Sequence, residues 1–159
     1  DRSRGWVSSH QFSLAPFGVS PILDGSLDGP LVALSGEGDG VIVLTGIADG
    51  RVWVSVTSAS ATAAEEPDRA VTGWEVFDEV SLSLVAGLYL SNPTMPVEIA
   101  EPVVSVERPG WHRVRALARG RRIDYDLSAS DSVEEYCIVV WPESTARERI
   151  SRDGDHLFT

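Results

Sequence analysis

The clearest signal of secondary structure in the chain is Trp74-Glu75-Val76-Phe77-Asp78-Glu79-Val80-Ser81-Leu82-Ser83-Leu84. Its apolar side chains share one parity at Trp74, Val76, Val80, Leu82 and Leu84. Its polar side chains share the other parity at Glu75, Glu79, Ser81 and Ser83, and the alternation slips around Asp78. A period of two turns one side of a strand toward a core and the other toward water. The stretch therefore predicts a half-buried β-strand with a solvated face.

Short apolar runs and turn residues extend this pattern along the chain. Residues 41–44 and 136–141 are continuous apolar runs, which are typical of central strands covered on both faces. Ala48-Asp49-Gly50 separates residues 40–47 from 51–59 and predicts a hairpin. The predicted strands are residues 6–14, 30–35, 40–47, 51–59, 73–84, 86–91, 96–99, 102–107, 111–119 and 134–141.

Many short strands at this spacing predict an all-β fold, a two-sheet antiparallel β-sandwich of the jelly-roll type with little helix. The 159 residues have the length of one domain, so we expect 1–159 to form a single sandwich. Residues 58–68 are expected to be a long loop, and Ser144 is the expected N-cap of a short helical turn over 144–150. The polar ending, 143–159, is expected to be a loose tail.

Cysteine usage and hydropathy bear on the compartment. Cys137 is the single cysteine, which excludes an internal disulfide and disfavours a structural zinc site. No apolar run reaches the roughly 18 residues that cross a bilayer, and the first residues lack the apolar core of a signal peptide. A cytoplasmic location without membrane contact fits these features best.

The charge balance is strongly acidic. The chain has 24 acidic and 13 basic residues, and every basic residue is an arginine. Residues 37–107 carry a net charge of −10, whereas 108–127 carry +4. Such a field repels nucleic acid, whose binding depends on cationic contacts to phosphate, and attracts a basic protein surface. The alternative interpretation is that acidity serves solubility alone.

Catalytic and metal-binding patterns are thin in this sequence. The three histidines, His10, His112 and His156, form no HxH or HxxxH pair, and no cysteine lies at ligand spacing. There is no GxSxG elbow, and Cys137 lies inside an apolar run, where a thiol has little reactivity. We therefore expect no catalytic residue, no metal and no cofactor, and an enzyme is the minority hypothesis.

Six arginines lie between Arg108 and Arg122, with Trp111 among them. A nucleic-acid patch is one interpretation of this pattern. The stronger interpretation is that the arginines alternate along a strand and pair with carboxylates on neighbouring strands, Glu134 and Glu135 being candidates. The net charge of −11 disfavours duplex binding.

Two acidic groups are the candidate partner-binding residues. They are the loop set Glu65, Glu66 and Asp68 and the strand-face set Glu75, Asp78 and Glu79. Carboxylates fixed on a sheet beside an acidic loop resemble a phosphate-mimicking surface, which can occlude a cationic groove in a partner. The alternative interpretation is a solvated loop and the outward face of a strand.

A family resemblance sharpens this hypothesis. Residues 7–14, Val-Ser-Ser-His-Gln-Phe-Ser-Leu, are followed in order by the segments 39–43, 52–57 and 74–84 and by Arg-Pro-Gly-Trp-His-Arg-Val-Arg at 108–115. This succession resembles the competence protein ComJ family, inhibitors of the nuclease NucA, and His-Gln-Phe at 10–12 is its most distinctive match. The ending at 134–142 looks like a recurrent ending in actinobacterial proteins. The resemblance implies a nuclease inhibitor and identifies no contact residue.

Three functional hypotheses follow from these observations. The first is an inhibitor or immunity-type partner of a basic nuclease or toxin, which acts by steric and electrostatic blockade. The second is a ligand- or carbohydrate-binding β-sandwich, which requires Trp74 or Trp111 on an open concave face. The third is a hydrolase of unfamiliar type, which requires a pocket where His10 or His112 meets carboxylates. Trp53, Trp74, Trp111 and Trp141 are the candidate core or interface anchors.

Overall fold

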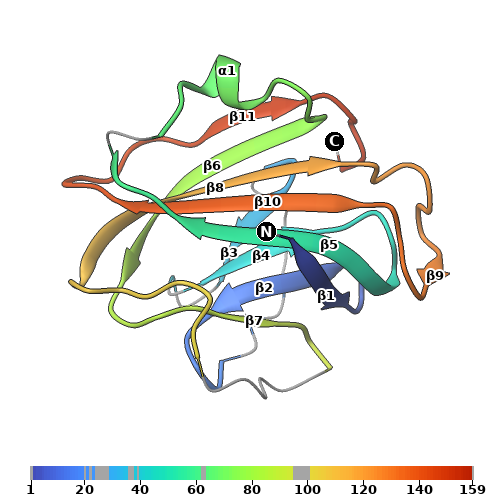
Figure 1. Cartoon of the computed structure of the whole chain (residues 1–159), viewed down its shortest axis with the longest axis horizontal. Coiled ribbons are helices and arrows are strands. Elements are labelled where there is room, and N and C mark those ends of the chain that lie inside the picture. Colours follow the sequence, from blue (N-terminus) through green and yellow to red (C-terminus); the bar gives the residue numbers. More distant parts are fainter. Residues whose placement is uncertain are drawn as a thin grey trace.

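Two β-sheets pack against each other in the computed structural model, which describes residues 2–19, 21, 23, 29–35, 38, 40–61, 64–94 and 101–158. Figure 1 shows the sheets as two layers, with the strands of the larger sheet crossing above β2, β3, β4 and β7 of the smaller one. The all-β, two-sheet sandwich predicted from the period of two is confirmed.

The larger sheet, sheet A, has seven strands in the order β1-β5-β10-β8-β6-β11, with β9 beside β5. Their bounds are β1 Ser3–Val7, β5 Asp49–Ser58, β6 Val76–Leu84, β8 Gly110–Arg119, β9 Ser128–Ala129, β10 Glu135–Pro142 and β11 Ile150–Asp153. β10 runs antiparallel to β8 but parallel to β5. Sheet A is therefore mixed, whereas the sequence predicted antiparallel sheets.

The smaller sheet, sheet B, has the order β3-β4-β2-β7. Its strands are β2 Gln11–Ala15, β3 Val32–Leu34, β4 Val41–Leu44 and β7 Tyr89–Ser91. β4 is buried at every position, which confirms the prediction of a strand covered on both faces. β10 is central in sheet A but keeps Glu135, Cys137 and Val139 only half-buried on its outer side.

The hydrophobic core lies between the two sheets. β6 and β8 supply to it Val76, Val80, Leu82, Leu84, Val114, Ala116 and Ala118. Phe12 of sheet B meets Tyr136 of sheet A edge to face, with ring centroids 5.3 Å apart. Val76, Val80, Leu82 and Leu84 of the predicted apolar parity therefore face the core, whereas Trp74, before the strand, packs in the outer layer with Phe77.

The outer face of sheet A carries a second, smaller apolar layer. The short helix α1 (Pro67–Ala70) contributes Ala70, which packs with Phe77 and Leu117. β11 pairs with β6 and extends the sheet, and Figure 1 shows α1 and β11 side by side next to β6. Neither element was predicted: α1 lies at the end of the expected loop, and β11 lies in the expected loose tail.

Residues 144–150 do not form the predicted helix. The Arg147 N–H donates to Ser81 Oγ, and the carbonyl oxygens of Arg147 and Glu148 accept hydrogen bonds from Arg113. These partners on sheet A satisfy backbone groups that a helix would otherwise satisfy internally, and the segment stays extended.

Other strand predictions also need correction. Ala48-Asp49-Gly50 closes no hairpin, because β4 belongs to sheet B and β5 to sheet A. Residues 6–14 form two strands, because Ser9 and His10 take positive φ values of 53° and 62° and turn the chain between β1 and β2. Residues 102–107 hold a single bridge, from Val104 to Leu88, and 96–99 lie outside the described residues.

Candidate partner-binding surface

Asp78 is buried, and both of its carboxylate oxygens accept hydrogen bonds. Its Oδ2 accepts hydrogen bonds from the backbone N–H groups of Leu31 at 3.2 Å and Val32 at 2.9 Å. Arg149 Nη1 lies 2.7 Å from the same oxygen, and Ser151 donates to Oδ1 at 2.8 Å. Asp78 therefore ties β3 and the C-terminal segment to β6, and the prediction that it faces a partner is wrong because the side chain is inaccessible.

Glu79 points to the outer side of β6, as predicted, but it is not solvated. Its side chain is 2% exposed, and its carboxylate forms ion pairs with Arg113 and Arg115. The Arg113 Nε–Glu79 Oε2 distance is 2.6 Å, and the Arg115 Nε–Glu79 Oε1 distance is 2.8 Å. A buried carboxylate requires such compensation, because an unpaired charge is costly in a low dielectric. The predicted solvated face is thus wrong at Glu79, which is structural and cannot contact a partner.

The arginines of β8 behave largely as predicted, since they pair with carboxylates on neighbouring strands. Arg113 and Arg115 share Glu79, and Arg119 lies 2.7 Å from Glu135. Glu134 has different partners: its carboxylate accepts hydrogen bonds from the backbone N–H groups of Gly46 and Ile47 at 3.0 and 2.6 Å.

The other four candidate residues remain accessible. Glu65, Glu66 and Asp68 are exposed at and just before α1, and Glu75 is exposed just before β6. Asp68 has an exposed ion pair with Arg152 at 3.1 Å. Glu75 Oε1 accepts a hydrogen bond from the Gly120 N–H at 2.5 Å, which places it beside the loop that follows β8. The structure thus separates the predicted set of six into four exposed and two buried carboxylates.

Burial hardly changes the net charge available to a partner. The buried carboxylates are Asp78, Glu79, Glu134 and Asp155, and the buried arginines are Arg113, Arg115 and Arg121. The described residues include 18 acidic and 13 basic residues, and removing the four buried carboxylates and three buried arginines leaves 14 and 10, a net of −4 against −5 before the removal. The acidic character is therefore a property of the surface.

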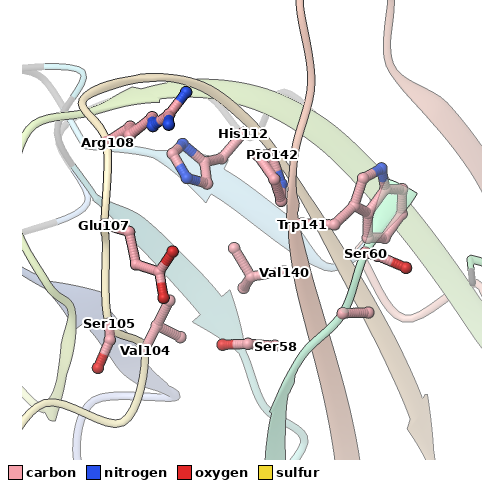
Figure 2. A pocket seen from close by; sticks show the side chains of 11 residues that line it. Ser58, Ser60, Val104, Ser105, Glu107, Arg108, His112, Val140, Trp141 and Pro142 are labelled. Carbon is pink, nitrogen blue, oxygen red and sulfur yellow. The ribbon is translucent and has the colours of Figure 1, made fainter. Parts of the chain in front are cut away.

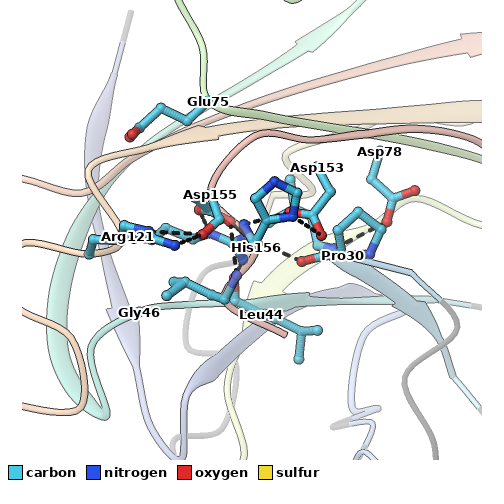
Figure 3. A network of polar contacts seen from close by, with 12 residues as sticks. Pro30, Leu44, Gly46, Glu75, Asp78, Arg121, Asp153, Asp155 and His156 are labelled. Atoms are coloured by element: carbon cyan, nitrogen blue, oxygen red, sulfur yellow. Dashed lines mark hydrogen bonds and ion pairs between the residues drawn. The ribbon is translucent and has the colours of Figure 1, made fainter. Parts of the chain in front are cut away.

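A buried polar network fixes one end of the sandwich. Tyr136 donates its hydroxyl hydrogen to the Glu134 carboxylate at 2.5 Å. Burial raises the pKa of Glu134 above its ordinary value of 4.5, although the hydrogen bonds from Tyr136, Gly46 and Ile47 and the charge of Arg121 lower it. Burial raises the pKa of Tyr136 well above its ordinary value, so the phenol stays neutral and remains a donor. Figure 3 shows the adjoining cluster, in which Arg121 contacts Asp155 and the backbone of Leu44 and Pro30.

The loop between β8 and β10 exposes apolar side chains, which the sequence pattern was not used to predict. Its large exposed side chains are Ile123, Tyr125, Leu127 and Val133. The loop is held in place, because the Asp126 N–H donates to Gly46 O at 2.8 Å and the Ala48 N–H donates to Leu127 O at 2.8 Å. The alternation Ile-Asp-Tyr-Asp-Leu at 123–127 is a signal that could have identified it.

Two histidines occupy distinct sites. His10 Nε2 lies 2.8 Å from Asp126 Oδ1, and its Nδ1 lies 3.2 Å from the Thr45 carbonyl oxygen. His112 is buried, and its Nδ1 donates to the Gly110 carbonyl at 2.9 Å. His10 is thus a turn residue that links loops.

The tryptophans divide between core and surface. Trp141 is buried, and Trp53 lies against two N-terminal arginines. The Arg119 guanidinium covers the ring of Trp74 at 4.5 Å from its centroid, whereas Trp111 is 41% exposed. Of the two residues that an aromatic platform for glycans requires, Trp111 alone has a large exposed surface.

No protein-family model, curated protein or solved structure matches the chain. In the described residues no helix has the length and apolar character to cross a membrane. The same residues contain no group of three or more His, Cys, Asp or Glu side chains placed to hold a metal ion. Function is therefore inferred from the chemistry of the surface.

Proposed function

We propose that this protein binds a basic protein and blocks it, as an inhibitor or immunity-type partner of a nuclease in the cytoplasm. The observation that carries this proposal is the exposure of Glu65, Glu66, Asp68 and Glu75 on a surface that keeps a net charge of −4 over the described residues after burial. A field of one sign attracts an oppositely charged partner over long range and speeds encounter with it.

The neighbourhood of Glu75 adds apolar contact area to this attraction. Glu75 bonds to Gly120, and the Ile123 N–H donates to Gly120 O at 3.3 Å, so the acidic set is connected to the apolar loop. Exposed apolar side chains that are fixed in place are typical of protein interfaces, where a few anchors carry most of the binding energy. Between Ile123 and Val133 the loop has three aspartates and no basic residue.

This combination favours a protein partner over a nucleic acid. Phosphates would be repelled by the acidic surface, whereas a cationic groove that normally holds phosphates would be attracted to it. The resemblance of the strand succession to ComJ proteins points to the same class of partner, a nuclease, and is the reason for choosing it among basic proteins.

A pull-down from the source cell extract at low and at moderate salt, read by mass spectrometry, tests the proposal. We expect a basic nuclease or toxin to be retained at low salt and progressively lost as salt screens the attraction. Retention that does not respond to salt, or the absence of any basic protein, would contradict electrostatic blockade.

A further inference from the structure

A pocket of about 430 Å³ lies at the end of sheet A where β5 and β10 finish. Residues 58–60, 104–105, 107–108 and 140–142 line it together with His112. Ser58 is paired with Val140, and Val140 with Val114 of the core, so these side chains share the inner face of the sheet. His112, two residues before Val114, continues that face. The pocket therefore begins where the apolar core layer gives way to polar residues.

The lining combines a buried apolar floor with a polar rim. Val104, Val140 and Trp141 are buried, whereas Ser58, Ser105, Glu107 and Arg108 are exposed. Figure 2 shows Arg108 and His112 on one side, Trp141 and Ser60 on another, and the Glu107 carboxylate directed toward the space above Val140. Enclosed sites with apolar walls and a few converging polar groups are typical of small-ligand binding, and this volume lies in their usual range.

The polar groups of the rim are available to a ligand. Within the described part of the chain, Glu107 and Arg108 form no ion pair or side-chain hydrogen bond, with each other or with any other residue. His112 Nδ1 donates to the Gly110 carbonyl, so Nε2 is the ring nitrogen left for a ligand. The rim thus offers the Glu107 carboxylate as an acceptor and the Arg108 guanidinium as a donor. It also offers the hydroxyls of Ser58 and Ser105, which can donate and accept, and the imidazole of His112.

We propose that this pocket binds a neutral polyhydroxylated ligand, a mono- or disaccharide unit. The charges of Glu107 and Arg108 cancel, so the rim carries no net charge from this pair and selects neither an anion nor a cation. A sugar ring matches the remaining requirements, because its C–H face suits the apolar floor and its hydroxyls both donate and accept along the rim. This site is separate from the acidic set and does not depend on the proposed partner.

Titration of the full chain with sugars, followed by amide chemical shifts in ¹H–¹⁵N spectra, tests the proposal. The probes are glucose, N-acetylglucosamine and cellobiose as neutral ligands, glucuronate as the anion and glucosamine as the cation. We expect saturable shifts with at least one neutral sugar, confined to amides of 58–60, 104–108, 112 and 140–142, and weaker binding of the two charged analogues.

Matched variants assign the binding to the rim. Glu107→Gln combined with Arg108→Gln should weaken the neutral sugar about tenfold, since hydrogen bonds to charged groups are lost. The control, Glu148→Gln combined with Arg69→Gln, makes the same chemical changes at exposed positions outside the pocket and should leave the affinity unchanged. Absence of saturable shifts with every neutral sugar, preference for glucuronate or glucosamine, or equal weakening by the control would overturn the proposal.

Discussion

Arg121 and Asp155 form a buried two-pronged ion pair, with Nε–Oδ2 and Nη2–Oδ1 distances of 2.7 Å each. Arg121 also donates to the carbonyls of Leu44 and Pro30, so one guanidinium joins sheet B, the loop after β8 and the C-terminal segment. Asp155 therefore joins the C-terminal segment to the folded core of the sandwich.

Asp155→Asn should destabilise the protein strongly. The substitution leaves the buried Arg121 without a counter-charge, which typically costs about 3–5 kcal/mol. The matched control is Asp68→Asn, which removes the exposed partner of Arg152 and should cost about 1 kcal/mol or less. Denaturant unfolding of both variants measures the difference, and similar losses in the two would show that the Arg121–Asp155 pair has no special structural role.

Glu79→Gln should lower the unfolding free energy strongly and Glu75→Gln only slightly, although the two residues lie four positions apart. Glu79 compensates both Arg113 and Arg115, so its neutralisation should cost about 3 kcal/mol or more of unfolding free energy. Glu75 is exposed, and its neutralisation should cost about 1 kcal/mol or less. Thermal and denaturant unfolding distinguish the two, and a mild Glu79→Gln phenotype would mean that Glu79 is solvated after all.

Glu134 should make a distinct contribution to the pH dependence of stability. Its folded-state pKa is raised above 4.5 by burial, so the folded protein holds this proton more tightly than the unfolded chain does. The associated stability is complete below the unfolded-state pKa and is lost as pH rises through the folded-state pKa. Glu134→Gln lacks this loss, so its unfolding free energy should rise relative to wild type as the pH increases above the ordinary value of 4.5. A constant difference across this range would show that the pKa of Glu134 is unshifted.

Local periodicity was enough to predict the central strands β4, β5, β6, β8 and β10, but not β11 or the environment of the outer faces. The parity of β6 identifies which apolar residues face the core, because a strand alternates whatever its neighbours are. The burial of Glu79 depends on Arg113 and Arg115, some 34 and 36 residues away, and on a C-terminal segment beyond them. Such pairing leaves no mark on the sequence around Glu79, so two of the six candidate carboxylates were wrongly placed on the surface.

Turn signals were equally ambiguous about sheet membership. Gly50 has a φ of 135°, and a Cβ there would lie 1.7 Å from the Ala129 carbonyl oxygen of β9. The glycine is therefore required by the approach of a distant strand and not by a hairpin between β4 and β5. The exposure of Glu65, Glu66, Asp68 and Glu75, by contrast, agrees with what a polar sequence before a strand predicts.

We propose that the carboxylates beside α1 and β6 occlude a basic nuclease. The most direct measurement is inhibition of a NucA-type nuclease at low salt by three proteins: wild type, Glu66→Lys with Glu75→Lys, and a control with Glu101→Lys and Glu107→Lys. Both doubles change the net charge equally at exposed positions, so a difference between them reports the site. We predict inhibition by wild type and by the control, and a loss of about tenfold or more for the first double, because like charges then face the partner. No inhibition by wild type, or equal inhibition by the two doubles, would contradict the account.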